Sequence, residues 1–210
     1  MSVYRFALLL VLPGLFSSWC FADDTAEPPV VYTLEVDGQS VTLAPDTPLK
    51  LEGNFNNPTL TLRVAQTRTL QADGITLNYP AYFTFEADTS DPEVKTWTAS
   101  GNDVTLMLFS FSEEVAAKAL AESTAQALQS RDLKVEAVKV KLGDSEREGV
   151  KATMTLADQS VIQQVLALPP SPRGSRLLVL QEVRGQGAGE AAELGATLKV
   201  VASSLKVADQ

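Results

Sequence analysis

The side chains that could do chemistry in this chain are carboxylates, arginines and aromatic rings. The 210 residues include no histidine, and the single cysteine is Cys20. A histidine-based triad, or a zinc site of the common nitrogen and sulfur type, cannot be assembled from such a set. Two carboxylates could still cleave glycosidic bonds, but no spacing singles out a pair. We therefore predict that the protein is not an enzyme and that it uses no cofactor.

Two arginines stand beside prolines near the end of the chain. Arg173 and Arg176, with Pro170 and Pro172, give a stiff basic segment in a sequence that is otherwise acidic. Loops carry function more often than cores do, and a local charge of opposite sign stands out in the surface potential. We expect these four residues to be surface contacts for an acidic partner. The alternative is an ordinary solvated connection between strands.

Aromatic residues gather in neighbouring strand-like segments. Tyr79, Tyr82, Phe83 and Trp97 could line a pocket for an apolar ligand. Packing of the same side chains between a sheet and its helices is the alternative.

One acidic turn has the residue types of a calcium site. Asp144, Glu146 and Glu148 alternate between Gly143 and Gly149. The fuller Asp, Asn and Gly pattern of calcium loops is missing, so the pattern favours a solvated hairpin tip without a metal.

The first 22 residues have the organisation of a secretory signal peptide. Arg5 is the only charged residue there, the apolar stretch 6–16 follows, and Ala22 precedes a predicted cleavage site. That stretch is too short to span a membrane, which requires roughly 20 residues. We predict an exported protein, periplasmic or secreted, without a transmembrane span. Lipid attachment at Cys20 is the alternative.

The charge balance restricts the partners. The chain has 17 basic and 26 acidic residues, a formal net charge of −9. An acidic chain repels phosphate backbones, so we expect no nucleic-acid binding. The expected partner is an envelope protein, whose identity the residues do not reveal.

The N-terminal quarter of the exported chain is predicted to be separate from the rest. Residues 23–29 form a polar leader that we expect to be disordered. Residues 30–70 contain short β-type runs around Asp37-Gly38, a strong hairpin signal, and 59–70 alternates like one half-buried strand. We therefore predict a β appendage at 30–70 that lies on, or extends, the sheet of a domain at 73–207.

Periodicity in that domain predicts strands and two helices. The run 104–111 is apolar on both faces, which is typical of a central strand covered on each side. Helices are expected at 112–131, capped by Ser112, and at 190–205, where Gly195 should mark a close packing contact. The alternation within 133–142 slips after Ala137, indicating a bulge or a bend. The fold class is thus α+β: an antiparallel sheet with two helices packed on it.

The order of these elements resembles the PsbP-like fold family, which includes DcrB-like bacterial proteins and the Mog proteins. The resemblance covers residues 73–207. It rests on the opening at 74–80, which ends in Tyr79-Pro80, on the Trp97 strand, the alanine-rich helix, the Gly149 hairpin and the closing Ser203-Ser204-Leu205. It implies a PsbP-like sandwich that works in binding or assembly rather than in catalysis. We therefore expect a binding protein of the bacterial envelope that acts through protein contacts. The alternative is a carrier of a small apolar ligand or lipid.

Overall fold

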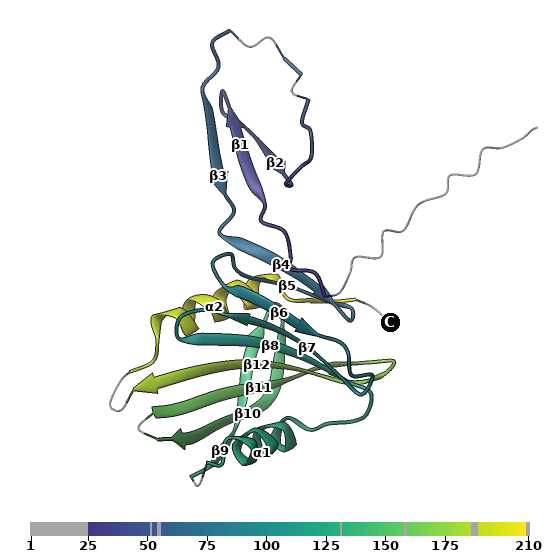
Figure 1. Cartoon of the computed structure of the whole chain (residues 1–210), viewed down its shortest axis with the longest axis vertical. Helices are drawn as coiled ribbons and strands as arrows, with labels where there is room; N and C mark the ends of the chain where they lie inside the picture. Colours follow the sequence, from purple (N-terminus) through teal and green to yellow (C-terminus); the bar gives the residue numbers. More distant parts are fainter. Residues whose placement is uncertain are drawn as a thin grey trace, which may run out of the picture.

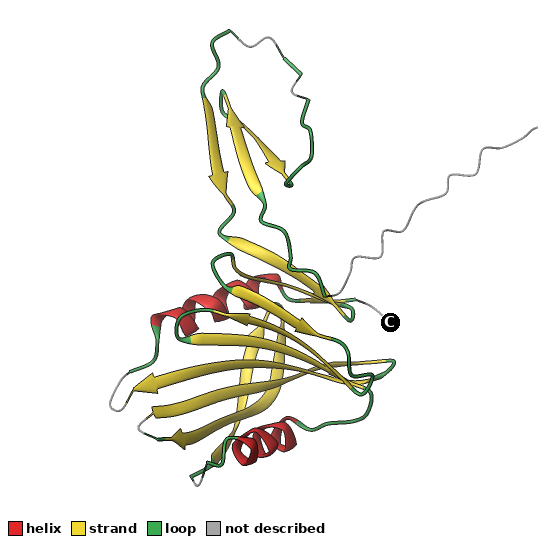
Figure 2. Ribbon diagram, in the orientation of Figure 1, coloured by secondary structure: helices red, strands yellow, loops and turns green. Residues whose placement is uncertain are grey.

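The computed structural model describes residues 25–50, 52–53, 56–130, 132–157, 159–185 and 189–208. The predicted signal peptide, its cleavage site and Cys20 lie outside these residues. The described part confirms the α+β class, with antiparallel sheets and two helices packed on them (Figure 2).

A seven-stranded antiparallel sheet forms the body of the molecule (Figure 1). Its strands, in spatial order, are β6 (Thr84–Asp88), β7 (Val94–Ser100), β8 (Val104–Phe111), β12 (Gly174–Gly185), β11 (Gln159–Ser171), β10 (Ser145–Leu156) and β9 (Lys134–Leu142). Strands consecutive in sequence pair with each other except at one place, where β8 pairs with β12. Two hairpin meanders therefore join at the centre of the sheet.

Different layers cover the two faces of this sheet. On one face lie helix α2 (Ala192–Ser204) and a small sheet of order β13-β5-β4, made of Lys206–Val207, Ile75–Pro80 and Thr67–Ala72. On the other face helix α1 (Ala117–Ala127) packs against β10 and β11. A buried apolar cluster fills each of the two interlayer spaces.

Strand β8 shows how the sequence specifies both layers. Leu106 and Leu108 are buried in the cluster beneath α2, whereas Met107 and Phe109 join the cluster beneath α1. Side chains alternate between the faces of a strand, so a strand with two covered faces must be apolar at every position. The prediction that 104–111 is a central strand is confirmed.

The slip in β9 has a different cause from the one predicted. Pairing with β10 continues in one register from Lys134 to Leu142, so no bulge interrupts that ladder. Val135 packs into the cluster beneath α1, whereas Val138 and Val140 pack into the cluster beneath α2. The covering layer changes along the strand, and the apolar positions change face with it.

Both helices are shorter than predicted, and the cap at Ser112 is wrong. Helix α1 begins after Ala116, which makes no side-chain cap hydrogen bond. The preceding backbone is held by β12: the Val115 N–H donates to Ser175 Oγ, and Ser175 donates its own N–H to the Glu113 carbonyl. These bonds hold residues 113–115 against the start of β12 instead of in a helical turn.

The close contact predicted at Gly195 is also wrong. A methyl group added at this position of α2 would meet no atom within 4 Å.

The appendage is a separate three-stranded sheet of order β2-β1-β3. It comprises β1 (Tyr32–Val36), β2 (Gln39–Leu43) and β3 (Leu60–Val64) and projects from the body (Figure 1). Asp37 and Gly38 both have positive φ, as the hairpin signal requires. The predicted strand 59–70 is two strands, because the chain turns after Val64 and β4 joins the body by pairing with β5. The appendage neither lies on nor extends the main sheet.

The part of the leader that the structure describes contacts the body. Pro28 is buried, and the Glu27 carboxylate forms an ion pair with Arg68 of β4. Residues 25–29 therefore differ from the disordered leader that we expected.

Candidate functional site

The prolines and arginines of segment 169–176 belong to the β11–β12 hairpin rather than to a long loop. Strand β11 continues to Ser171, and β12 begins at Gly174. Pro170, Pro172 and Arg173 are exposed, as predicted. A pocket of about 710 Å³ lies between this turn and the segment before α1, with Glu113 and Arg173 in its lining. The turn thus has a shaped, charged surface suited to a contact.

Arg176 reaches the lining of that pocket but is buried, so the prediction that it is an exposed contact is wrong. Its exposed fraction is 2%, and its guanidinium donates three hydrogen bonds to backbone carbonyls. Nε donates to Pro169 O (2.8 Å), Nη1 to Asp73 O (2.6 Å) and Nη2 to Pro170 O (3.0 Å). Burial lowers the pKa of Arg176, and the Asp73 carboxylate opposes part of that shift.

The prolines explain why a cation is placed there. Pro169 and Pro170 lack the N–H that an antiparallel ladder needs, and the β11–β12 register shifts between Leu168 and Ser171. Their carbonyls therefore have no strand partner, and a backbone carbonyl shielded from water without a donor is costly. The guanidinium supplies the donors that the irregular ladder lacks, so Arg176 is a structural residue.

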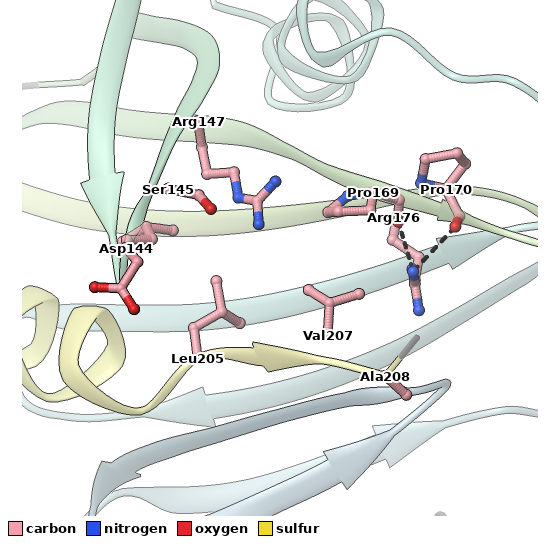
Figure 3. Close-up of a pocket in the computed structure, with 10 residues that line it drawn as sticks. Asp144, Ser145, Arg147, Pro169, Pro170, Arg176, Leu205, Val207 and Ala208 are labelled. Atoms are coloured by element: carbon pink, nitrogen blue, oxygen red, sulfur yellow. Dashed lines mark hydrogen bonds between the residues drawn. The ribbon is translucent and has the colours of Figure 1, made fainter. Parts of the chain in front are cut away.

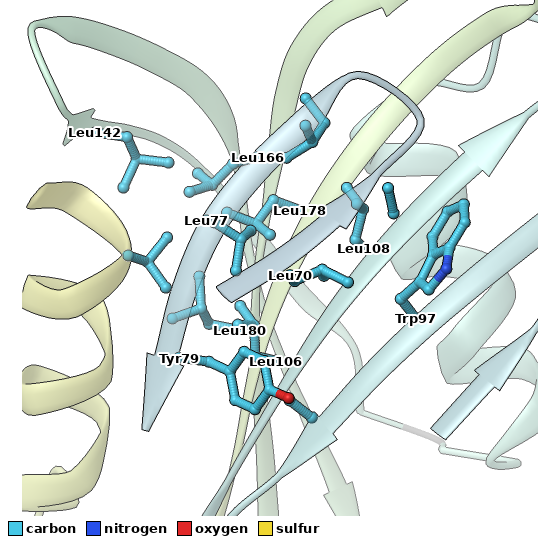
Figure 4. Close-up of a cluster of buried hydrophobic side chains, with 14 of the residues drawn as sticks. Leu70, Leu77, Tyr79, Trp97, Leu106, Leu108, Leu142, Leu166, Leu178 and Leu180 are labelled. Atoms are coloured by element: carbon cyan, nitrogen blue, oxygen red, sulfur yellow. The ribbon is translucent and has the colours of Figure 1, made fainter. Parts of the chain in front are cut away.

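The predicted aromatic pocket is core packing for three of its four residues. Tyr79, Phe83 and Trp97 are at most 1% exposed and belong to the cluster beneath α2. Figure 4 shows Tyr79 and Trp97 among the leucines of that cluster. None of the three lines a pocket described here. The arrangement gives no support to an aromatic-lined cavity at these positions.

Tyr82, the fourth aromatic residue, is exposed and ties α2 to the sheet. Its hydroxyl donates to Glu193 Oε1 (2.8 Å), and Glu193 Oε2 accepts the N–H groups of Asp103 (2.6 Å) and Val104 (2.9 Å). Partial desolvation of the hydroxyl, and then the Glu193 hydrogen bond and charge, raise the pKa of Tyr82 to about 12, although the residue as a whole is exposed. Burial also raises the pKa of Glu193, but these donors outweigh it and the net shift is downward.

Among the described residues, the most buried carboxylate belongs to Glu182 at the far end of β12. It accepts hydrogen bonds from Arg184 Nη2 (2.6 Å) and from the Ala191 N–H just before α2. Burial alone would raise the pKa of Glu182. These two hydrogen bonds and the Arg184 charge lower it by more than burial raises it, so the net shift is downward. A general acid needs a raised pKa. Glu182 and Glu193 therefore hold α2 in place and do not match the carboxylate pair that glycosidic cleavage requires.

The acidic tip at 144–148 is tied to a lysine rather than gathered into a cage. Lys139 Nζ lies 3.0 Å from Glu148 Oε1 and 4.0 Å from Glu146 Oε2. Within the described ranges, no three His, Cys, Asp or Glu residues gather closely enough to hold a metal ion. None of the helices in that same part of the chain combines the length and apolar character needed to cross a membrane.

The feature that sequence reasoning missed is an exposed apolar face on the appendage. Leu60, Leu62 and Val64 of β3 are 58%, 61% and 56% exposed. They are in register with Val36, Leu34 and Tyr32 of β1, so all six side chains share one face. Val36 is buried and the other two β1 residues are half-buried, so the exposed part of this face lies on β3. Alternation alone was interpreted as half-burial, but it cannot distinguish a covered face from an uncovered one.

Comparison with known proteins adds no identity to this geometry. Neither a protein-family model nor a curated protein sequence matches the chain. The functional argument therefore rests on the surfaces themselves.

Proposed function

We propose that the protein is an exported, non-enzymatic binding or assembly protein of the bacterial envelope that acts through its appendage. The partner is a protein that contributes an extended segment. That segment pairs with the outer edge of β3 and covers the apolar face with its own alternating apolar side chains. The resemblance to the PsbP-like family implies a role in binding or assembly, which agrees with this proposal. The absence of histidine from the sequence agrees with it as well.

The observation that carries the proposal is the unprotected edge of β3. This strand pairs with β1 on one side and has no strand on its other side among the described residues. Proteins usually protect such edges with inward-pointing charges, prolines or bulges. The one charged residue of β3, Arg63, lies on the polar face, where it pairs with Glu35 at 3.3 Å. Unpaired backbone groups together with an apolar face are what strand addition requires.

Charge favours a protein segment over an anionic membrane surface as the occupant. Residues 31–64 contain four acidic and two basic residues, so their formal charge is −4 + 2 = −2, within a chain of −9. A surface with this balance is repelled by acidic lipids. Exposed patches of apolar side chains with polar surroundings mark protein contacts.

Photo-crosslinking in the bacterial envelope tests the proposal. A benzophenone side chain at position 62 should give a covalent product whose mass spectrum identifies the partner and the contacting segment. Leu62→Glu should then weaken the binding of that purified partner at least about tenfold, because a central apolar anchor becomes a buried charge. Thr61→Glu places the same charge on the polar face of the same strand and should have less than about a third of that effect.

The cross-linked product also discriminates among occupants. A cross-linked product made of two copies of this chain, together with self-association in a sedimentation experiment, would show that the partner is a second copy of this protein. Attachment to lipid alone, or equal losses in the Leu62 and Thr61 variants, would overturn the proposal.

A further inference from the structure

A second pocket lies beside the proline segment of the β11–β12 hairpin and shares Pro170 and Arg176 with the first pocket. It has a volume of about 500 Å³ and lies between the β9–β10 turn, β11 and the segment that follows α2 (Figure 3). Its lining combines two arginines with apolar side chains. The residues used below are Leu142, Asp144, Arg147, Arg176, Leu205 and Val207.

Arg147 supplies donors that the protein itself does not use. It extends from β10 toward Pro169 and Arg176, is half-buried, and pairs across the ladder with Val140. Its Nε is buried and has no hydrogen-bond partner among the described residues. A buried N–H without an acceptor is costly, and more so when it carries charge. An anion in the pocket would meet that donor.

Arg176 adds a second positive charge to the same pocket. Three of the five N–H donors of a guanidinium bind the carbonyls described above, so two remain. No carboxylate in the described part of the chain lies within 4.0 Å of it. The Asp73 carboxylate acts on Arg176 only from beyond that distance, so the groups that touch the guanidinium are carbonyl dipoles. A buried cation held in this way gains from a nearby anion.

The rest of the lining selects among anions. Leu142 is 2% exposed, and Leu205 and Val207 lie across the pocket from the arginines, so one wall is apolar. Asp144 contributes one negative charge, which makes the formal charge of the lining +2 − 1 = +1. Such a balance favours a monoanion over a dianion, and the apolar wall favours a ligand with a hydrocarbon part.

We propose that this pocket binds a small monocarboxylate with a short apolar chain. The carboxylate accepts hydrogen bonds from Arg147 and lies within the field of Arg176, while the chain packs on Leu205 and Val207. Guanidinium groups suit carboxylates because their donors form a planar fork. This site is separate from the appendage and does not depend on its role.

Titration of the isotope-labelled chain, without residues 1–22, tests the site by nuclear magnetic resonance. Hexanoate should produce saturable amide shifts confined to the β9–β10 turn, Ser145 to Arg147 and Val207. Hexanol, which lacks the charge, and hydrogen phosphate, which lacks the chain, should each bind at least about tenfold more weakly. A parallel titration with N-acetyl-leucine, which mimics the C-terminal end of a peptide, distinguishes a peptide end from a free acid. The tighter ligand of N-acetyl-leucine and hexanoate identifies which of the two kinds of carboxylate the pocket prefers.

Three variants make the test specific. Arg147→Gln should weaken hexanoate binding roughly 10- to 100-fold, the range expected for a charged hydrogen-bond donor. Lys141→Gln removes one positive charge from the same hairpin on the opposite face and should change affinity less than about twofold. Asp144→Asn should tighten hexanoate binding, because it removes the one negative charge of the lining. Asp144 is exposed, so this substitution should not disturb the fold.

The spectra themselves show whether each variant is folded. Shifts spread over the whole surface, equal affinity for hexanol and hexanoate, or equal losses in the Arg147 and Lys141 variants would overturn the proposal.

Discussion

Arg176 shows how one residue can look like a surface contact in sequence and be a structural cation in the fold. Its neighbours Pro170 and Pro172 are exposed, but alternation along β12 turns Arg176 inward. At the other end of the same strand, on the same face, Glu182 is buried and binds Arg184 and the Ala191 N–H. Strand β12 thus carries a buried cation that fixes irregular backbone at one end and a buried anion that fixes α2 at the other.

Replacement of the two hairpin arginines separates their roles. Arg176→Met should lower the free energy of unfolding by about 3 kcal/mol, because three backbone carbonyls lose their charged donor. Arg173→Met, at an exposed position directly after Pro172, should change it by less than about 0.5 kcal/mol. Urea denaturation followed by circular dichroism measures both. Equal stability of the two variants would contradict the structural role of Arg176.

At the scale of elements, the two glycines singled out in the sequence analysis, Gly149 and Gly195, have opposite surroundings. A methyl group at Gly149 in β10 would lie 2.1 Å from the Val165 carbonyl oxygen and 2.9 Å from Leu166 Cα. At Gly195 in α2 it would meet nothing within 4 Å. Gly149 is therefore required by close approach of β11, whereas Gly195 only weakens its helix.

Alanine substitution at the two positions should shift stability in opposite directions. Gly149→Ala should destabilise the protein by about 3 kcal/mol, because backbone atoms of β11 must move. Gly195→Ala should stabilise it by about 1 kcal/mol, the difference in helix propensity between the two residues. Thermal unfolding of the two variants beside the unchanged protein measures both changes in stability. A loss of stability at Gly195 would restore the close contact that the sequence suggested.

Periodicity predicted the elements of the body better than it predicted their partners. It located the central strand at 104–111 and two helices, because burial on two faces or on one helical stripe leaves a pattern in local sequence. It misread the slip after Ala137 as a bulge, since the cause is a change of covering layer that only the tertiary structure contains. The helix start at Ser112 failed for the same reason, because Ser175, far along the chain, binds that backbone.

The candidate sites followed the same division between local and tertiary information. Exposure of Pro172 and Arg173 could be predicted because turn residues lie at the surface wherever the hairpin packs. The pocket beside Arg147 could not, because Arg147 and Val207 come from segments that meet only after the sheet and α2 have packed.

At the scale of the whole molecule, the appendage and the body are joined by two chain crossings that lie side by side. The Ala65 N–H donates to the Val31 carbonyl at 2.8 Å, so the two crossings close like the base of a hairpin. The strands of the appendage make their main contacts with one another. The body, by contrast, contains both apolar clusters and the basic pocket.

This arrangement predicts that the appendage can be removed without unfolding the body. Replacing residues 32–64 with Asn-Gly, which forms a two-residue hairpin turn, should reconnect Val31 and Ala65 without strain. The free energy of unfolding of the body should change by less than about 1 kcal/mol, since neither buried cluster contains a residue of 32–64. Hexanoate affinity should be retained while cross-linking to the partner is lost. A shortened protein that no longer unfolds cooperatively would show that the appendage and the body form one folding unit instead.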